Sequence, residues 1–386
     1  RGMPHSCPKP AKAAYSKHKT SRPIGMRKKQ NRNASIARCV IALTSSFLLT
    51  AAAAATHQYE HENISIPAAS ANESKRETFS LQAALNYLDE GALAWSRERQ
   101  CVSCHTNGSY LLTRPSLTEL AGPPSKEVRT FCESQLVEFQ NQSPDSLKKG
   151  IVPTQLAYLA AGLANWDRHV AKRLSNQTTQ ALELMLSSQA ENGSFSNDDC
   201  WPPLESSEYH GATVAALAIL ATPNWQDTTS YRRHEPQVKK LWHYLQTTMP
   251  PHDYAQLLLL WVTAEKPDLL DHLQKEPLIN RMLELQQSDG GWSLRSFAGA
   301  NQWGGGNRGK KLLAEGNYHN PESDGHQTGL VTYVLQKAGL STTHPAIRKG
   351  LDWLLANQRE SGRWWTRSLN TDKFHFITYS GTCYPL

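Results

Sequence analysis

One short segment of the sequence combines residues whose types and spacing could carry chemistry, Cys101-Val-Ser-Cys104-His105. Two thiols separated by two residues can form thioether bonds to both vinyl groups of a haem, and the adjacent imidazole can then bind the iron. The pattern therefore predicts a covalent c-type haem on Cys101 and Cys104, with His105 as the metal ligand. Two alternatives stay open: a redox or structural disulfide between the two cysteines, and a zinc-binding or structural role.

Two pairs of an acid and a histidine form the next candidate group, Glu208 with His210 and Asp324 with His326. Each pair stands just ahead of a segment with helical spacing, residues 213–221 and 328–338. An acid at such a position favours the start of a helix, which is one explanation of the pattern. The recurrence of the pair gives a second one, in which the two pairs face each other at the rim of a central cavity and take part in catalysis.

Helices must position these candidates, because the apolar residues recur at spacings of three and four and no stretch alternates with a period of two. The sequence predicts a first helix from Leu81 through Trp95 that ends in the charged residues 97–99. It predicts further helices around 128–139, 154–163 and 178–189. The fold class that follows is all-α.

A short pattern recurs three times along the chain. It consists of a glutamine, a glycine four residues later and an aromatic residue two positions after that. A glutamine at a helix end can bond carbonyl groups that lack a partner, a glycine can adopt the left-handed cap, and the aromatic ring can pack over the helix end. The pattern predicts a structural repeat. Its copies are Gln189, Gly193 and Phe195; Gln286, Gly290 and Trp292; and Gln358, Gly362 and Trp364.

The third copy extends upstream through Lys349, Gly350, Trp353 and Leu354, and in this form it resembles the QW motif of squalene-hopene and oxidosqualene cyclases. The resemblance implies an α/α toroid over residues 77–386, the fold shared by terpenoid cyclases and protein prenyltransferases. It also implies a small apolar ligand, such as an isoprenoid, in a cavity rich in aromatic residues. The phrase around the two cysteines resembles a segment of exported squalene-cyclase-like proteins of environmental bacteria.

The same resemblance suggests roles for the residues around Asp198. Asn197-Asp198-Asp199-Cys200 resembles the DxDDT acid motif of squalene-hopene cyclases, although only the two adjacent aspartates match. There a carboxylic acid starts cyclisation, which requires a pKa raised by burial. Asp198, Cys200 and His210 are also the ligand types that bind zinc in protein prenyltransferases. The alternative to both is an exposed polar loop.

Charge is distributed unevenly along the chain. The first 38 residues hold eleven Lys or Arg and no acid, which exceeds the formal net charge of +7, so the remainder is slightly acidic and no nucleic-acid partner is expected. Basic residues after Met26, the uncharged stretch 39–55 and its small residues at the end predict a signal peptide over 26–55. We therefore expect an exported, periplasmic or extracellular protein. Membrane association is possible, and an uncleaved anchor is the alternative.

The expected organisation is thus an upstream extension over 1–25, the signal peptide, a linker over 56–76 and one helical domain over 77–386. The third inner helix looks unfinished at Leu386, so we expect a domain truncated at its C-terminus. The leading function is binding or transformation of an apolar ligand, with Asp198, Asp199, Glu208, His210, Asp324 and His326 as catalytic candidates. The alternatives are a haem-based redox protein with a redox partner, and a toroid polysaccharide lyase that would use bases such as Arg295 or Arg308.

Overall fold

The computed structural model describes residues 57–197 and 201–386, and within these residues the fold is all-α apart from one β-hairpin, as predicted. Residues 56–386 form one compact unit. The predicted signal peptide, the upstream extension and the residues 198–200 lie outside the described residues. None of the helices in 57–197 and 201–386 has the length and apolar composition that crossing a membrane requires.

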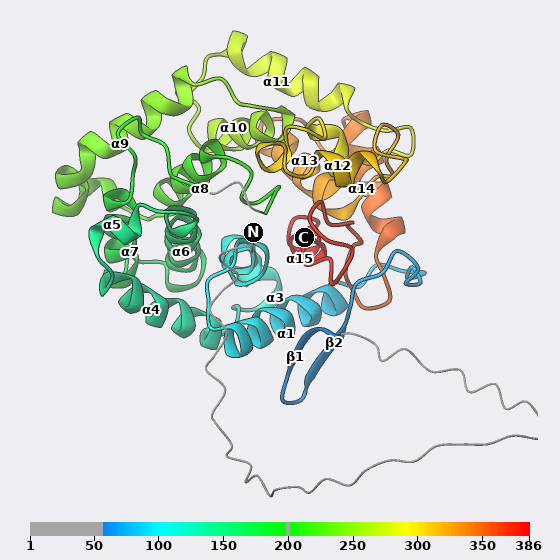
Figure 1. Ribbon diagram of the computed structural model, residues 1–386, viewed down its shortest axis with the longest axis horizontal. Coiled ribbons are helices and arrows are strands. Elements are labelled where there is room, and N and C mark those ends of the chain that lie inside the picture. Colours follow the sequence, from blue (N-terminus) through cyan, green and yellow to red (C-terminus); the bar gives the residue numbers. More distant parts are fainter. Residues whose placement is uncertain (1–56, 198–200) are drawn as a thin grey trace, which may run out of the picture. The chain divides into compact units, whose positions relative to one another are not determined.

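Six helices form an inner set in which each contacts the next and the last contacts the first (Figure 1). Helices α8 and α10 are buried along most of their length, because neighbours surround them and small or aliphatic residues fill their sequences. The inner set consists of α2 (Ser109–Thr113), α6 (Val152–Trp166), α8 (Glu208–Ala221), α10 (Asp253–Glu265), α13 (Gly325–Lys337) and α15 (Ile377–Cys383).

The remaining long helices pack outside this inner set and each buries one face against it (Figure 1). Their polar residues lie on the opposite face, which is the arrangement expected of amphipathic helices at the surface of a domain. The outer helices are α1 (Leu81–Arg99), α4 (Lys126–Gln140), α7 (Asn176–Ser187), α9 (Thr229–Thr247), α11 (His272–Glu284) and α14 (Pro345–Asn357). Three short helices connect the longer ones: α3 (Thr118–Ala121), α5 (Pro144–Leu147) and α12 (Gly309–Leu313).

The outer helices α7, α11 and α14 end in corners that share one hydrogen-bond pattern. In each corner the glutamine side-chain amide donates to the carbonyl of the glycine four residues later and to a carbonyl of another outer helix or of its N-cap. Two of these second acceptors lie at a helix start, and Gln237 lies within α9. The acceptors are Gly362 and Ser80 for Gln358 (both 2.9 Å), Gly290 and Ala346 for Gln286 (both 2.8 Å), and Gly193 and Gln237 for Gln189 (both 3.1 Å). Because Ser80 caps α1, the last corner joins the end of the domain to its beginning.

The aromatic residue of each corner is buried beside the helix that it follows. Trp364 and Trp292 each donate their indole N–H to a carbonyl ten residues earlier, at Leu354 and Met282, both at 2.8 Å. Both rings and Phe195 are at most 1 % exposed. The expected burial of Trp364 and the expected positive φ of Gly362, which is 91°, are confirmed. The place of Trp353 in the helical stripe of the third copy also predicts burial, and this prediction is wrong, because the ring is half-buried and donates to Asp289.

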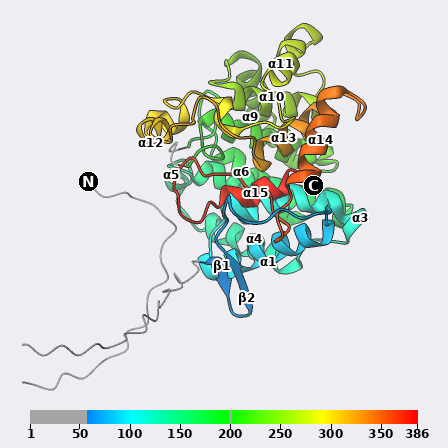
Figure 2. The same ribbon diagram turned by 90° about the vertical axis from the view of Figure 1, so that its right-hand side faces the viewer.

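The predicted helices are present, but the linker predicted over 56–76 is wrong. Strands β1 (His57–His61) and β2 (Ile64–Pro67) form an antiparallel hairpin beside α1 (Figure 2). Its apolar residues Tyr59, Ile64 and Ile66 are buried in the core. The segment was misjudged because its apolar side chains are few and are spread among polar ones, yet each of them packs onto α1.

The corner geometry predicts that Gly362→Ala costs more stability than the same change at Gly316. Both glycines have positive φ, so an added Cβ strains the backbone at either site by about 1–3 kcal/mol. At Gly362 the Cβ would also overlap the backbone of Ala83 in α1, whereas nothing lies within 4 Å at Gly316. Urea unfolding of the two variants measures the difference. Equal losses would show that close approach of α14 to α1 is not a constraint.

Candidate functional site

The two predicted histidines occupy equivalent places in the inner set, as the recurrence of the pairs suggested. His210 lies in the first turn of α8 and His326 in the first turn of α13. Each bonds a tyrosine of a neighbouring inner helix through Nε2: Tyr158 of α6 at 2.9 Å and Tyr254 of α10 at 3.2 Å. All four side chains are at most 1 % exposed. We call these four residues the Tyr–His stack.

The rings of the Tyr–His stack lie one upon another across the interior of the inner set. His210 and Tyr254 are nearly parallel, at 7° with centroids 6.2 Å apart. Tyr158 also stacks against His210, with centroids 6.0 Å apart, and His326 against Tyr254, with centroids 5.9 Å apart. Tyr384 adds an edge contact to His326 at 5.1 Å. Polar aromatic rings thus take part in the contacts among four helices, α6, α8, α10 and α13.

Hydrogen bonds around His326 determine which ring nitrogen carries its proton. Ser380 Oγ donates to the carbonyl of Ile377, so it accepts from His326 Nδ1 at 3.0 Å. His326 Nε2 is therefore an acceptor, and Tyr254 donates to it. Burial lowers the pKa of both His210 and His326 to about 3, with a smaller contribution from a neighbouring histidine, so both rings are neutral near pH 7. Within the described residues, His210 Nδ1 lacks a hydrogen-bond partner.

The acids of the two pairs point away from the histidines. Asp324 caps α13 and accepts from the backbone of Gln327 at 3.0 Å and of Leu294 at 2.6 Å. Burial raises its pKa to about 6, against the opposing effect of these bonds. Glu208 is exposed and accepts from Ser194 at 2.8 Å. The structure therefore brings the histidines together but separates each from its acid. Asp198, Asp199 and Cys200 lie outside the described residues.

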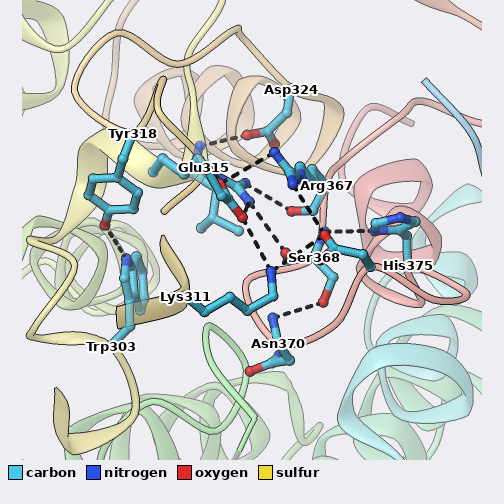
Figure 3. Close-up of polar contacts among 12 residues, drawn as sticks. Trp303, Lys311, Glu315, Tyr318, Asp324, Arg367, Ser368, Asn370 and His375 are labelled. Atoms are coloured by element: carbon cyan, nitrogen blue, oxygen red, sulfur yellow. Dashed lines mark hydrogen bonds and ion pairs between the residues drawn. The ribbon is translucent and has the colours of Figure 1, made fainter. Parts of the chain in front are cut away.

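Asp324 borders a buried ionic cluster around Glu315 (Figure 3). Arg295 bonds Glu315 at 2.7 Å, and both side chains are at most 6 % exposed. Burial opposes ionisation of Glu315, but Arg295, with Arg367 and Lys311, outweighs it and lowers the pKa of Glu315. Because Arg295 is held in this ion pair, it is not placed to act as the base of a lyase.

The CxxCH segment is buried at the start of a π-helical turn, Cys104–Gly108. Cys101 is disulfide-bonded, while Cys104 is a thiol that donates to Glu205 Oε1 at 3.2 Å. The alternative of a disulfide between Cys101 and Cys104 is therefore wrong for this structure. The other half of the Cys101 disulfide is not Cys104, Cys132 or Cys383, which are all thiols.

His105 packs among aromatic rings. Its imidazole stacks on Phe376 with centroids 5.1 Å apart and meets the edge of Trp95 at 4.7 Å, and its Nδ1 shares a 2.8 Å hydrogen bond with Thr106. Burial lowers the pKa of His105 to about 4. These residues do not fit a covalent haem as they stand, because Cys101 is already in a disulfide and rings cover the imidazole. Haem attachment stays a prediction, and it would require this arrangement to open.

The expected zinc site falls partly outside the described residues, at Asp198 and Cys200. His210, its third ligand, bonds Tyr158 through Nε2. Among residues 57–197 and 201–386, no group of three His, Cys, Asp or Glu side chains is placed to hold a metal ion.

A cavity of about 150 Å³ lies where the inner helices end. Its walls come from the C-terminal parts of α6, α8, α10 and α13, from α2 and from the residues around α15. Tyr384 lines it and contacts His326, so one ring separates the cavity from the Tyr–His stack. None of the predicted catalytic residues that the structure describes, Glu208, His210, Asp324 and His326, lines it. The main lining residues are Leu112, Leu117, Leu217, Leu220, Trp261, Tyr333, Tyr384 and Leu386.

Sequence reasoning missed Tyr158, Tyr254, Tyr384 and Glu205. Tyr254 follows the start of α10 by one residue, as His326 follows the start of α13. Aligning the predicted helix starts could therefore have shown that Tyr254 and His326 occupy the same position in their helices. Glu205 had no such signal, because its role depends on a contact with a residue about a hundred positions away.

The buried histidines predict that stability falls as the pH drops below about 6.5. The unfolded chain takes up protons there, whereas folded His326 stays neutral to about pH 3, so each such histidine can cost at most about 1.4 kcal/mol per pH unit. Urea unfolding between about pH 7 and 5 should show a shallower loss for His326→Gln than for the exposed control His319→Gln. Asp324 has the opposite effect on stability: between its raised pKa and its usual value, the folded state gains stability as the pH falls. This contribution is the same in both variants. Equal slopes, or an NMR pKa of His326 near 6.5, would contradict this.

No protein-family model matches this chain, and no curated protein matches it significantly.

Proposed function

We propose that residues 77–386 form an α/α toroid of the kind found in terpenoid cyclases and prenyltransferases. Two observations support this: the inner helices contact one another in a closed cycle, and three outer helices end in corners with one bonding pattern. The corner at Gln358 links α14 to α1, which is what a ring of repeats needs in order to close.

We further propose that the protein, exported by the signal peptide over 26–55, binds an apolar ligand in the cavity at the ends of the inner helices. The observation that carries this proposal is the set of aliphatic and aromatic side chains that α2, α8, α10 and α13 contribute to the lining, together with Tyr384 and Leu386. Specific small-molecule sites are concave, mostly apolar and formed where several elements meet.

The cavity volume limits the part of the ligand that is enclosed. A cavity of about 150 Å³ lined by apolar residues can hold a molecule of the size of benzene. This matches one branched isoprenoid unit, with the rest of a longer chain extending through the mouth. Among the lining residues, the carboxylate of Glu265 forms ion pairs with Lys337 at 3.1 Å and with Arg168 at 3.8 Å. Its negative charge is therefore balanced by two cations. Binding is favoured over transformation, because the catalytic candidates that the structure describes do not line this cavity.

A cavity-filling substitution tests ligand binding. Geraniol, a short isoprenoid alcohol, should raise the melting temperature of the protein, since a ligand stabilises the state that binds it. Leu217→Trp places a large ring in the cavity and should abolish this rise. Leu355→Trp on the exposed face of α14 is the control and should respond as the wild type does. No rise with the wild type, or an equal rise in both variants, would count against binding in this cavity.

The second candidate function is a redox protein centred on the CxxCH segment. The observation that favours it is the presence, three residues apart, of a disulfide-bonded cysteine and a buried thiol beside a carboxylate. If haem is attached covalently, protein from cells with the c-type maturation machinery should stay coloured after denaturing electrophoresis, and Cys101→Ser with Cys104→Ser should not. Colourless wild-type protein under these conditions would exclude the haem form of this candidate.

A further inference from the structure

The lining of the cavity at the ends of the inner helices divides into an apolar part and a polar part. The buried residues of the described lining are aliphatic or aromatic, apart from one cysteine. Its exposed residues are Ser116, Arg168 and Lys337, which are all polar. A ligand whose apolar end is enclosed would therefore have its other end beside these three side chains.

The charged side chains of the described lining are two cations and one acid. The carboxylate of Glu265 lies between the cations, with Oε1 at 3.1 Å from Lys337 and Oε2 at 3.8 Å from Arg168. Counting these side chains alone, the lining has one positive charge in excess. A separation of 3.8 Å is longer than a hydrogen bond, so this contact leaves the N–H donors of the guanidinium to other acceptors. A second carboxylate can therefore bind beside the first.

Arg168 and His169 are consecutive residues of a π-helical turn, Asp167–Ala171, that follows α6, and both line the cavity. Single π-helical turns at helix ends and within helices are frequent at functional sites. Burial lowers the pKa of His169, with smaller contributions from neighbouring cations, so its ring is neutral near pH 7. A neutral imidazole keeps one N–H donor. His169 can therefore donate a hydrogen bond to an anion without adding a charge to the site.

We propose that the ligand of this cavity is a monocarboxylic acid with a branched apolar chain, and that Arg168, His169 and Lys337 bind its carboxylate. The proposal rests on the proposed function, because it names the class of ligand for the same cavity. Arginine forms strong, directional hydrogen bonds with carboxylates. The single excess positive charge matches a monoanion, whereas a diphosphate would bring more negative charge than the lining balances.

Isothermal titration calorimetry with two ligands of one carbon skeleton tests the proposal. Geraniol has a hydroxyl group where geranic acid has a carboxylate, which is ionised at about pH 7.5. The wild type should bind geranic acid about tenfold more tightly than geraniol, because hydrogen bonds to an ionised group are the stronger ones. Arg168→Gln and Lys337→Gln should each lower this ratio by about threefold or more. Titration with geraniol reports in the same sample whether the cavity of a variant is intact.

Two further variants serve as controls. Arg348→Gln removes an exposed arginine of α14 that does not line the cavity, so it should keep the wild-type ratio. Leu217→Trp fills the cavity and should abolish binding of both ligands. Geranic acid bound by Leu217→Trp as tightly as by the wild type would lie elsewhere, and this would overturn the proposal.

Failure of this proposal differs from failure of the proposed function. If the wild type binds geraniol and geranic acid equally, or if the Arg168 and Lys337 variants keep the wild-type ratio, the cavity binds apolar ligands but the carboxylate site is overturned. If neither ligand binds, both proposals are overturned. Tighter binding of geranyl diphosphate than of geranic acid would show a site for a multiply charged phosphate, which also overturns the assignment of a carboxylate.

Discussion

The bond network of Gln358 is the constraint on which the rest of the domain depends. Its amide and carbonyl bond both backbone groups of Ser80 and the carbonyl of Gly362, and the side chain has no exposed surface. Ser80 in turn caps α1. A buried amide that makes three good bonds fixes the end of one helix against the start of another, while a missing partner would leave a buried polar group unsatisfied. The first and last outer helices are held in register in this way.

The contact between the first and last outer helices encloses the inner helices, and this limits how their polar side chains can be hydrogen-bonded. Helices that contact neighbours on all sides leave little room for solvent, so polar rings placed inside them must bond one another. The Tyr–His stack meets this need for His326, whose two nitrogens both have partners. It does so incompletely for His210, whose Nδ1 has none within the described residues. The same burial keeps both rings neutral, which suits histidines that act as hydrogen-bonding groups rather than as charges.

The sequence predicted those features that local chemistry controls. Helical spacing predicted α1, α4, α6 and α7. The glycine in each corner predicted a positive φ, because few other residues adopt that conformation. The hairpin before α1 escaped notice, since its stability comes from contacts with that helix rather than from its own pattern. The acid and histidine pairs were seen as units because they are adjacent in sequence. Successive residues of a helix start point in different directions, so Asp324 caps α13 while His326 faces inward.

The CxxCH segment shows the limit of such reasoning most clearly. A spacing of two residues between cysteines is compatible with haem attachment, with a local disulfide and with zinc binding, and the sequence does not separate them. What separates them is the environment of each sulfur: Cys101 is in a disulfide, Cys104 faces Glu205, and His105 is covered by Phe376 and Trp95. Glu205 is distant in sequence and belongs to no motif. The carboxylate is nevertheless the hydrogen-bond acceptor that the structure places beside the buried thiol.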